Sequence, residues 1–364
     1  MGSLKCGIVG LPNVGKSTLF SALSGISVPA ENYPFCTVEP NIAIVEVPDD
    51  RLQAIRNCMP SDKLVPATCE FVDIAGLIRG ASKGEGLGNQ FLGHIRSVDA
   101  ILHVVRCFDD DNIIHVEGKI DPLSDLDTIF VELALSDLEV VNKRLDNLDR
   151  KMKAQDKEAK GQRDILEKVK PFLERGEKAR SAQLSADDLN VIRDLNLLTL
   201  KPDLYIANVS EDDVKGENPY VKKLLERGEK DGSDVVIICA KIEAEIASLS
   251  PEEAKGFLQD LGLSESGLSR LIRKAYHMLG LRTFFTAGPK EIHAWTFEEG
   301  AFAPQAAGKI HSDFEKGFIR AETYHVGDLI ELKNEKLIRE KGKMRMEGKE
   351  YVVKDGDVMV FHFA

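Results

Sequence analysis

Residues 10–17 of this chain read GLPNVGKS and fit the phosphate-loop pattern G-x-x-x-x-G-K-[ST]. The apolar run at 4–9 before them predicts a buried strand, and residues 18–23 after them predict an amphipathic helix. Glycines allow the backbone to wrap closely around a phosphate, and the helix adds its positive N-terminal end. The alternative is a glycine-rich turn that matches by chance, but the strand–loop–helix context favours a nucleotide-phosphate site.

Two side chains of this stretch have specific predicted roles. Lys16 would reach the β- and γ-phosphates of a nucleotide, and the Ser17 hydroxyl would bind Mg²⁺. In potassium-activated relatives of this class, an asparagine at the position of Asn13 helps to hold K⁺ near the developing charge, so K⁺ is a further candidate cofactor. The predicted phosphate-binding residues are Asn13, Val14, Gly15, Lys16, Ser17 and Thr18.

Composition limits the class of protein. The chain has 364 residues, a length that allows about two or three domains. Its net charge is −12, and 43% of its residues are hydrophobic, which is enough for an ordinary folded core. No apolar run approaches the ~20 residues of a membrane span, and the first strand starts too early to leave room for a cleaved targeting segment. The six cysteines are scattered, so neither a disulfide scaffold nor a zinc site is expected, and a reducing cytoplasm fits. The acidic charge argues against DNA as a partner and leaves RNA only a local patch.

The predicted fold class is α/β. Strand-like and helix-like runs alternate over residues 1–121 and return over residues 199–279. This alternation predicts a P-loop NTPase domain, similar to a G domain, with a mostly parallel sheet and helices on both faces. Residues 280–364 contain short strands separated by turn signals and predict a small C-terminal α+β domain.

A different pattern interrupts the first domain over residues 122–198. Apolar positions such as Val131, Ala134 and Leu138 alternate at spacings of three and four, with charges between them. This is typical of a coiled-coil seam, and we expect an inserted antiparallel helical hairpin over roughly 125–180. A short helix should begin after Ser185, because Asp188 completes a capping pattern. The hairpin could also be a spacer, or an arm for a partner, that carries no chemistry.

Two further segments fit the nucleotide-sensing switches of GTPase-type proteins. Residues 73–76 read DIAG after a predicted strand. Asp73 would hold Mg²⁺ through water, and the Gly76 N–H would sense the γ-phosphate. In residues 32–37, which read NYPFCT, Thr37 is the candidate second Mg²⁺ ligand. The alternative for either segment is a surface loop unrelated to a nucleotide.

The base-reading segment at residues 208–211 is NVSE, where guanine-specific proteins carry N-K-x-D. The aspartate of that motif accepts two hydrogen bonds from guanine, whereas the carboxylate of Glu211 is one methylene further out. This change weakens selection for guanine more clearly than it creates selection for adenine. The misplaced pair of hydrogen bonds could remove ~1–3 kcal/mol of the preference for guanine. Asn208 could instead only cap a helix. The predicted base-side residues are Asn208, Val209 and Glu211, with Cys239, Ala240 and Lys241 of a loop that resembles the S-A-K loop.

Together these segments resemble the Obg-like ATPase, or YchF, family. The resemblance includes GEGLGN at residues 84–89, spans essentially the whole chain, and makes residues 280–364 look like a TGS domain. It implies a cytoplasmic, Mg²⁺-dependent ATPase with slow intrinsic turnover that prefers ATP to GTP and acts as a nucleotide-gated switch on the ribosome. Two alternatives stay open, namely an Obg-type GTPase and a ribosome-binding module in which hydrolysis is only a reset.

Hydrolysis must use another group than the one in Ras-type proteins, or be slow until a partner supplies one. Leu77 stands where those proteins carry the glutamine that orients the attacking water, and leucine cannot hydrogen-bond water. The resemblance places the family's proposed catalytic histidine at His115. From the sequence alone His115 could equally be a packed or capping side chain. The predicted catalytic residues are thus His115, Lys16 and Gly76.

One basic stretch offers a contact for RNA. Residues 333–349 carry seven Lys or Arg against three Glu, a local charge of +4. Such a patch could touch the phosphates of rRNA, and the alternative is a solvated hairpin between strands. The sequence does not indicate the oligomeric state, and the expectation is a monomer.

Overall fold

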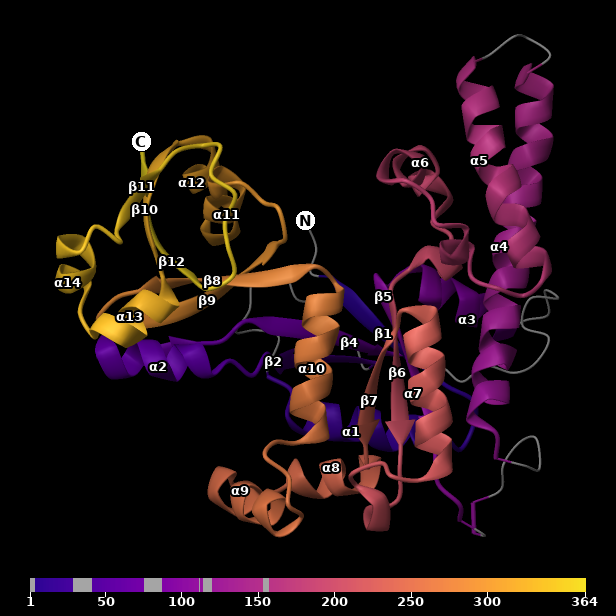
Figure 1. Ribbon diagram of the computed structural model, residues 1–364, viewed down its shortest axis with the longest axis horizontal. Coiled ribbons are helices and arrows are strands. Elements are labelled where there is room, and N and C mark those ends of the chain that lie inside the picture. Colours follow the sequence, from indigo (N-terminus) through magenta and orange to yellow (C-terminus); the bar gives the residue numbers. More distant parts are fainter. Residues whose placement is uncertain (1–3, 29–40, 75–86, 111, 114–119, 153–156) are drawn as a thin grey trace. The chain divides into compact units, whose positions relative to one another are not determined.

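The computed structural model describes residues 4–28, 41–74, 87–110, 112–113, 120–152 and 157–364 (Figure 1). The chain forms two compact units, one of residues 1–43 with 70–270 and one of residues 44–69 with 271–364. Among the described helices, none combines the length and the apolar composition that crossing a membrane would require.

A six-stranded sheet with the strand order β2-β4-β1-β5-β6-β7 organises the first unit. Its strands are β1 Lys5–Val9, β2 Ile42–Glu46, β4 Thr68–Asp73, β5 Ala100–Arg106, β6 Asp203–Asn208 and β7 Asp234–Ile238. The neighbours from β4 through β1, β5 and β6 to β7 are all parallel, which confirms the predicted sheet. Every residue of β5 and β6 is buried, as expected for central strands covered on both faces.

Helices precede or follow these strands in the chain. They are α1 Lys16–Gly25, α3 Leu87–Arg96, α4 Pro122–Met152, α5 Lys157–Glu174, α6 Ala186–Val191, α7 Pro219–Asp231, α8 Ala240–Ile246, α9 Pro251–Asp260 and α10 Gly267–Met278. Short 3₁₀ helices lie between them, at η3 Ala179–Ala182, η4 Arg193–Leu195, η5 Leu198–Leu200 and η6 Glu211–Asp213. Because the strands are parallel, their C-terminal ends share one edge, and the loops that leave this edge carry the predicted nucleotide motifs.

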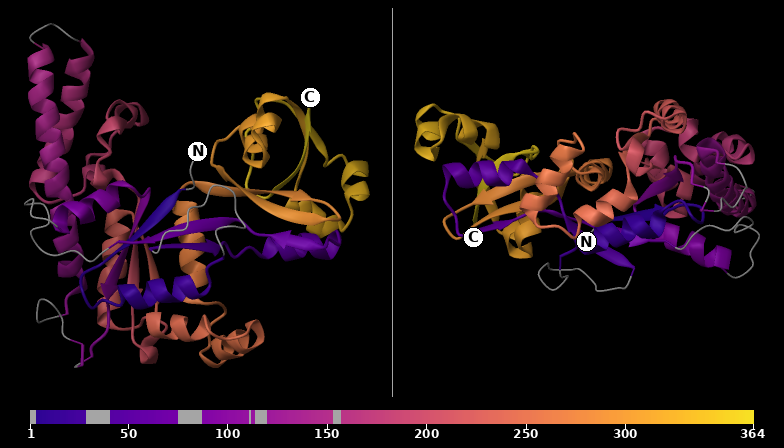
Figure 2. Two further views of the ribbon diagram at one scale, coloured as in Figure 1. Left: turned by 180° about the vertical axis from the view of Figure 1, so that it is seen from behind. Right: turned by 90° about the horizontal axis from the view of Figure 1, so that it is seen from below.

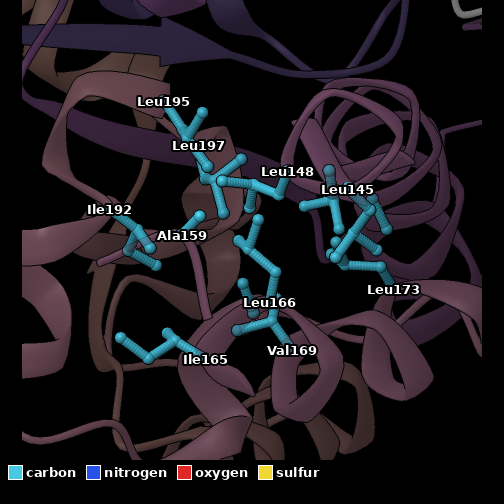
Figure 3. Packing of buried hydrophobic residues seen from close by; sticks show 13 residues of the cluster. Leu145, Leu148, Ala159, Ile165, Leu166, Val169, Leu173, Ile192, Leu195 and Leu197 are labelled. Atoms are coloured by element: carbon cyan, nitrogen blue, oxygen red, sulfur yellow. The ribbon is translucent and has the colours of Figure 1, made fainter. Parts of the chain in front are cut away.

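The predicted hairpin is present as α4 and α5, which lie side by side and project away from the sheet (Figures 1 and 2). Its seam is a cluster of buried apolar side chains that includes Leu145, Leu148, Leu166 and Val169 (Figure 3). Val131 was expected on this seam but is 41% exposed. The reason is length, because the 18 residues of α5 can cover only part of the 31 residues of α4.

The predicted short helix is also confirmed. It is α6, and Ser185 and Asp188 form a reciprocal capping box at its start. The Ser185 hydroxyl accepts a hydrogen bond from the Asp188 N–H, while the Asp188 carboxylate accepts one from the Ser185 N–H. This cap depends only on residues three apart, which is why the sequence pattern was sufficient to predict it.

Buried polar contacts connect the hairpin to the sheet, and we call this region the hairpin root, defined by Asp137, Lys178, Thr199, Lys201 and Asp203. Asp137 on α4 is 1% exposed, and its carboxylate accepts hydrogen bonds from the backbone of Leu198 and from both the backbone and hydroxyl of Thr199, at 2.6–2.8 Å.

The two lysines of the hairpin root extend these contacts to neighbouring elements. Lys201 Nζ donates to the carbonyls of Ile95 and Arg96 at 3.1 and 2.9 Å, at the C-terminal end of α3. Lys178 Nζ pairs with Asp203 at 2.5 Å, at the start of β6. The hairpin root therefore ties α3, α4 and β6 together through charged groups that are largely removed from water.

The second unit contains a mixed sheet with the order β11-β10-β12-β8-β9-β3. Its strands are β3 Lys63–Val65, β8 Leu281–Ala287, β9 Glu291–Glu298, β10 Phe318–His325, β11 Arg345–Glu347 and β12 Asp357–Phe363. Its helices are α2 Asp50–Cys58, α11 Ala303–Ile310, α12 Ser312–Lys316, α13 Val326–Leu332 and α14 Glu335–Glu340. The core includes Phe284, Phe297 and Phe318, and these elements agree with the predicted α+β texture of the C-terminal residues.

Candidate nucleotide-binding site

The phosphate loop turns at Gly15, which has a φ of +93° and directly precedes α1. Residues with a Cβ are strained in this left-handed region of the backbone. Space is also lacking, because a Cβ added at Gly15 would lie 2.1 Å from Nδ2 of Asn208. Both constraints explain the glycine at this position, and they show that the phosphate loop contacts the base-side motif directly.

The start of α1 is suited to an anion. Gly15 supplies no side-chain acceptor at the N-cap, and the first turn contains no acidic residue. The first N–H groups of a helix lack partners within the helix and carry the positive end of its dipole. Ser17 and Thr18 are exposed in this turn. Together these features provide the polarity and the hydroxyl groups that a phosphate and its metal ion require.

Lys16 and Asp73 meet at this edge of the sheet. The parallel register of β1 and β4 sets Ile8 opposite Asp73, so the loop that follows β1 lies beside the end of β4. Lys16 Nζ pairs with Asp73 Oδ1 at 2.5 Å, and the two side chains are 10% and 24% exposed. The cation predicted to bind phosphate and the carboxylate predicted to serve Mg²⁺ are therefore brought together, although 57 residues separate them in sequence.

The described residues also fit a magnesium ion. The hydroxyl of Ser17 and the carboxylate of Asp73 are hard oxygen donors of the kind that Mg²⁺ prefers. Within the described ranges, no group of three or more His, Cys, Asp and Glu side chains could hold a metal by itself. Mg²⁺ at this edge would thus take its other ligands from nucleotide oxygens and water, as is common for this ion. Thr37, Gly76 and His115 lie outside the described residues, and their roles stay predictions.

Asn208 links the phosphate loop to the base-side loop. It ends β6 and is 4% exposed. Its Nδ2 donates to the Val14 carbonyl at 2.8 Å, and its Oδ1 accepts from the Ala240 N–H at 3.0 Å. Both polar atoms of the amide are therefore occupied by backbone groups on the two flanking loops. The structure gives Asn208 the role of a clamp that holds these loops together, beyond the simple helix cap considered as an alternative.

Three other predicted base-side residues face the protein interior. Val209 is 2% exposed, and its N–H donates to the Ile238 carbonyl at 2.9 Å. Cys239 is 6% exposed at the N-cap of α8, and burial raises the pKa of its thiol. Ala240 is 2% exposed, and its N–H is bound by Asn208. These residues shape the backbone beneath the predicted base site, and their side chains are not presented to solvent.

Glu211 and Lys241 are the exposed members of the base-side set. Glu211 begins η6 after β6, and Lys241 lies in the first turn of α8 after β7. Lys241 Nζ donates to Glu211 Oε2 at 2.7 Å, and this hydrogen bond raises the pKa of Lys241. The two side chains are 67% and 47% exposed, respectively. The carboxylate that replaces the guanine-reading aspartate is thus engaged by a cation from the neighbouring loop.

Arg106 was not singled out from the sequence. It ends β5 opposite Asn208 in the register with β6 and is 1% exposed. Its guanidinium donates to the carbonyls of Phe108, Asp110 and Ile113 at 2.9–3.1 Å. Arg106 therefore orders the start of the loop that leaves this edge after β5. The available signal was a single cation at the end of an otherwise apolar strand, because such a charge needs partners when buried.

The basic stretch at residues 333–349 differs from the plain hairpin that was one interpretation of the sequence, and its contact with rRNA stays a prediction. It contains the helix α14 and the short strand β11, so it is not a plain hairpin between strands. Three of its cations are paired at 3.0 Å or less within the second unit. Arg339 contacts Glu322 at 2.8 Å, Lys343 contacts Asp328 at 2.6 Å, and Arg345 contacts Glu347 at 3.0 Å. These pairs reduce the positive charge that the stretch can offer to phosphates.

Comparison with known proteins agrees with this geometry. Residues 5–161 match a family described as 50S ribosome-binding GTPase, and residues 281–364 match a YchF-GTPase C-terminal family described as a protein of unknown function. The chain is 55% identical over 359 residues to the ribosome-binding ATPase YchF of Haemophilus ducreyi and 53% identical over 363 residues to that of Bacillus subtilis. In both comparisons 99% of each chain is covered.

A solved structure extends the likeness to three dimensions. The structure of the YchF GTPase from Schizosaccharomyces pombe is 40% identical in sequence and has a TM-score of 0.88. The match covers 100% of this chain and 98% of that one. On the identity and coverage of these relatives, together with the geometry of its phosphate loop, the chain belongs to the YchF family.

Proposed function

We propose that this protein is an Mg²⁺-dependent P-loop ATPase that binds and hydrolyses ATP in preference to GTP and acts as a nucleotide-gated switch on the ribosome. The observation that carries the proposal is the meeting of Lys16 and Asp73 beside the uncapped start of α1. Relatives that cover 99% of the chain are named ribosome-binding ATPases, which supports both the reaction and the partner.

The site suggests how the switch would work. Phosphates at the start of α1 would attract Lys16 away from Asp73, because a polyphosphate carries more negative charge than one carboxylate. Asp73 would then be free to orient water around Mg²⁺, with Ser17 as a direct ligand and Thr37 as the second protein hydroxyl. The metal would neutralise charge on the β- and γ-phosphates. Gly76 would sense the γ-phosphate, and His115 would orient the attacking water in place of the glutamine that Leu77 replaces.

Each predicted domain has a part in this proposal. Residues 1–121 and 199–279 bind the nucleotide, residues 122–198 form the hairpin arm, and residues 280–364 form the TGS-like domain. We propose that the ribosome is contacted by the last two, through rRNA or ribosomal protein, in the cytoplasm and by a monomer. Asn13 is exposed, with a φ of 64°, and it is the residue through which K⁺ would act.

The base preference is the part of the proposal that is most easily overturned. One relative with the same fold is called a GTPase, while the curated relatives are called ATPases. The deciding measurement is the equilibrium affinity of the purified chain for labelled ATP and GTP with Mg²⁺. Tighter ATP binding supports the ATPase. A GTP preference of about tenfold or more, about 1.4 kcal/mol, would instead support the Obg-type GTPase.

A second measurement separates the enzyme from a binding module in which hydrolysis is only a reset. Leu77 favours the module, because leucine cannot orient water as the glutamine of Ras-type proteins does. Turnover that ribosomes stimulate and that His115→Ala abolishes would support the enzyme. Unchanged turnover in that variant, with ATP-dependent ribosome binding, would support the module. Turnover in K⁺ and in Na⁺ tests Asn13, since equal rates would remove K⁺ from the mechanism.

A further inference from the structure

We propose that Lys241 determines nucleotide specificity by pairing with Glu211. The paired side chains favour adenine, and the carboxylate is no longer free to accept both hydrogen bonds from guanine. This inference rests on the proposed preference for ATP and names a residue that enforces it. The sequence analysis placed the two residues in separate loops and predicted no contact between them. The ion pair at 2.7 Å makes them one unit.

The backbone on both sides of this pair is held in place. Glu211 follows β6 and Lys241 follows β7, and the ends of these parallel strands are in register at Asn208 and Ile238. Asn208 Oδ1 accepts the N–H of Ala240, the residue before Lys241, and Val209 donates to the carbonyl of Ile238. The two side chains therefore project from loops whose spacing is set by buried hydrogen bonds, while the side chains themselves stay exposed.

The chemistry of the two bases explains why pairing matters. Guanine presents two adjacent donors, N1–H and the 2-amino group, and two acceptors on one carboxylate complement them. Adenine presents one donor, the 6-amino group, beside one acceptor, N1. A carboxylate bound to an ammonium offers one remaining oxygen as acceptor and ammonium N–H groups as donors, which complements the adenine pattern. A free carboxylate would repel the lone pair on adenine N1.

Other charges near the pair do not replace Lys241. Asp212 and Asp213 follow Glu211 in η6, and Glu245 lies one helical turn beyond Lys241 on α8. All of these are acidic, so none of them can pair with Glu211 when the Lys241 ammonium is removed. An unpaired Glu211 carboxylate favours the hydrogen-bond donors of guanine over the lone pair on N1 of adenine. Exposure of the pair limits the size of the effect, because water screens such contacts.

The experiment measures the ratio of GTP to ATP dissociation constants, with Mg²⁺, for four proteins. They are the wild type, Lys241→Met, Glu211→Gln and the double variant. Methionine keeps the length of the lysine stem, and glutamine keeps the shape of the glutamate. We expect Lys241→Met to shift the ratio toward GTP by about fivefold. In the Glu211→Gln background the same change should leave the ratio within about twofold, because the carboxylate that it exposes is absent.

Two further variants control the result. Lys241→Arg keeps a cation that can pair with Glu211 and should retain the wild-type ratio. Lys222→Met removes an exposed lysine of α7 and should change nothing. A ratio that stays within about twofold in Lys241→Met, or that shifts equally in both backgrounds, would overturn the inference. A wild type that prefers GTP would overturn the proposed ATPase itself, so the two failures are distinguishable.

Discussion

The nucleotide-binding edge and the hairpin root use polar residues in opposite ways. At the edge, Ser17, Thr18 and Lys241 are exposed, and the geometry comes mainly from backbone shape at Gly15. At the hairpin root, the buried charged and hydroxyl groups satisfy one another, as shown by Asp137, Thr199 and Asp203 at 1–6% exposed. The edge keeps its polar groups available to a ligand, whereas the root uses them to hold elements together. Substitutions should therefore impair function at the edge and stability at the root.

The largest effect is expected from Lys16→Met at the edge. Loss of the phosphate-binding cation should lower ATP turnover by about 10²–10³-fold, as removal of one preorganised charge-stabilising group does in other enzymes. Folding stability should change little, because the Lys16–Asp73 pair lies at the rim of the sheet with Asp73 24% exposed. Steady-state turnover and urea unfolding measure the two effects.

A matched lysine at the opposite end of β1 serves as the control. Lys5 pairs with Glu70 at 3.5 Å, away from the phosphate loop. Turnover per folded molecule should stay within about twofold in Lys5→Met. If both substitutions lowered turnover alike, the special role of Lys16 would be lost.

The next largest effect is expected from Asp137→Ala at the root. The change leaves the N–H groups of Leu198 and Thr199 and the Thr199 hydroxyl without their acceptor in a dry site. The free energy of unfolding should fall by about 3 kcal/mol. Asp146→Ala, at an exposed position of the same helix, should change it by less than about 0.5 kcal/mol. Urea unfolding of both variants checks this, and equal losses would show that the buried hydrogen bonds are not the cause.

Asn208→Ala tests a buried polar side chain of the edge. Loss of its bonds to Val14 and Ala240 should cost about 2 kcal/mol of unfolding free energy. Because the phosphate loop loses its support whatever the base, affinities for ATP and GTP should fall together. Their ratio should stay within about twofold, in contrast to Lys241→Met. Titration with both nucleotides distinguishes the two, and a ratio that shifts would mean that Asn208 reads the base directly.

The last effect concerns acid stability at the root and appears only at low pH. Burial alone would raise the pKa of Asp203, but the Lys178 ammonium and the Arg180 guanidinium hold it at about 2. A carboxyl group with a lowered pKa stabilises the fold above its unfolded pKa, and this stabilisation is lost as the pH falls. We expect a loss of about 2 kcal/mol between about pH 4 and pH 2 that Asp203→Asn lacks. Urea unfolding at pH 5, 4, 3 and 2 measures it, and parallel pH profiles of the two proteins would contradict it.

The sequence alone was sufficient wherever the determining contacts are local. The strand, glycine turn and helix around residues 4–25, the capping box at Ser185 and Asp188, and the alternation that marks the parallel sheet all depend on neighbours within a few residues. Hydrogen bonding and apolar periodicity at that range can be read directly from the order of residues. The hairpin was predictable for the same reason, except near Val131, where the length of α5 decided burial.

Only the tertiary structure decided the contacts between distant segments. The Asn208 clamp, the pairing of Glu211 with Lys241 and the Asp137 network each join segments that are far apart in sequence. A single polar residue has many chemically equivalent partners in the sequence. Packing selects among them by removing competing water, and this selection depends on the whole fold. The sequence thus determined which chemistry the edge can carry, and the fold determined which side chains remain free to perform it.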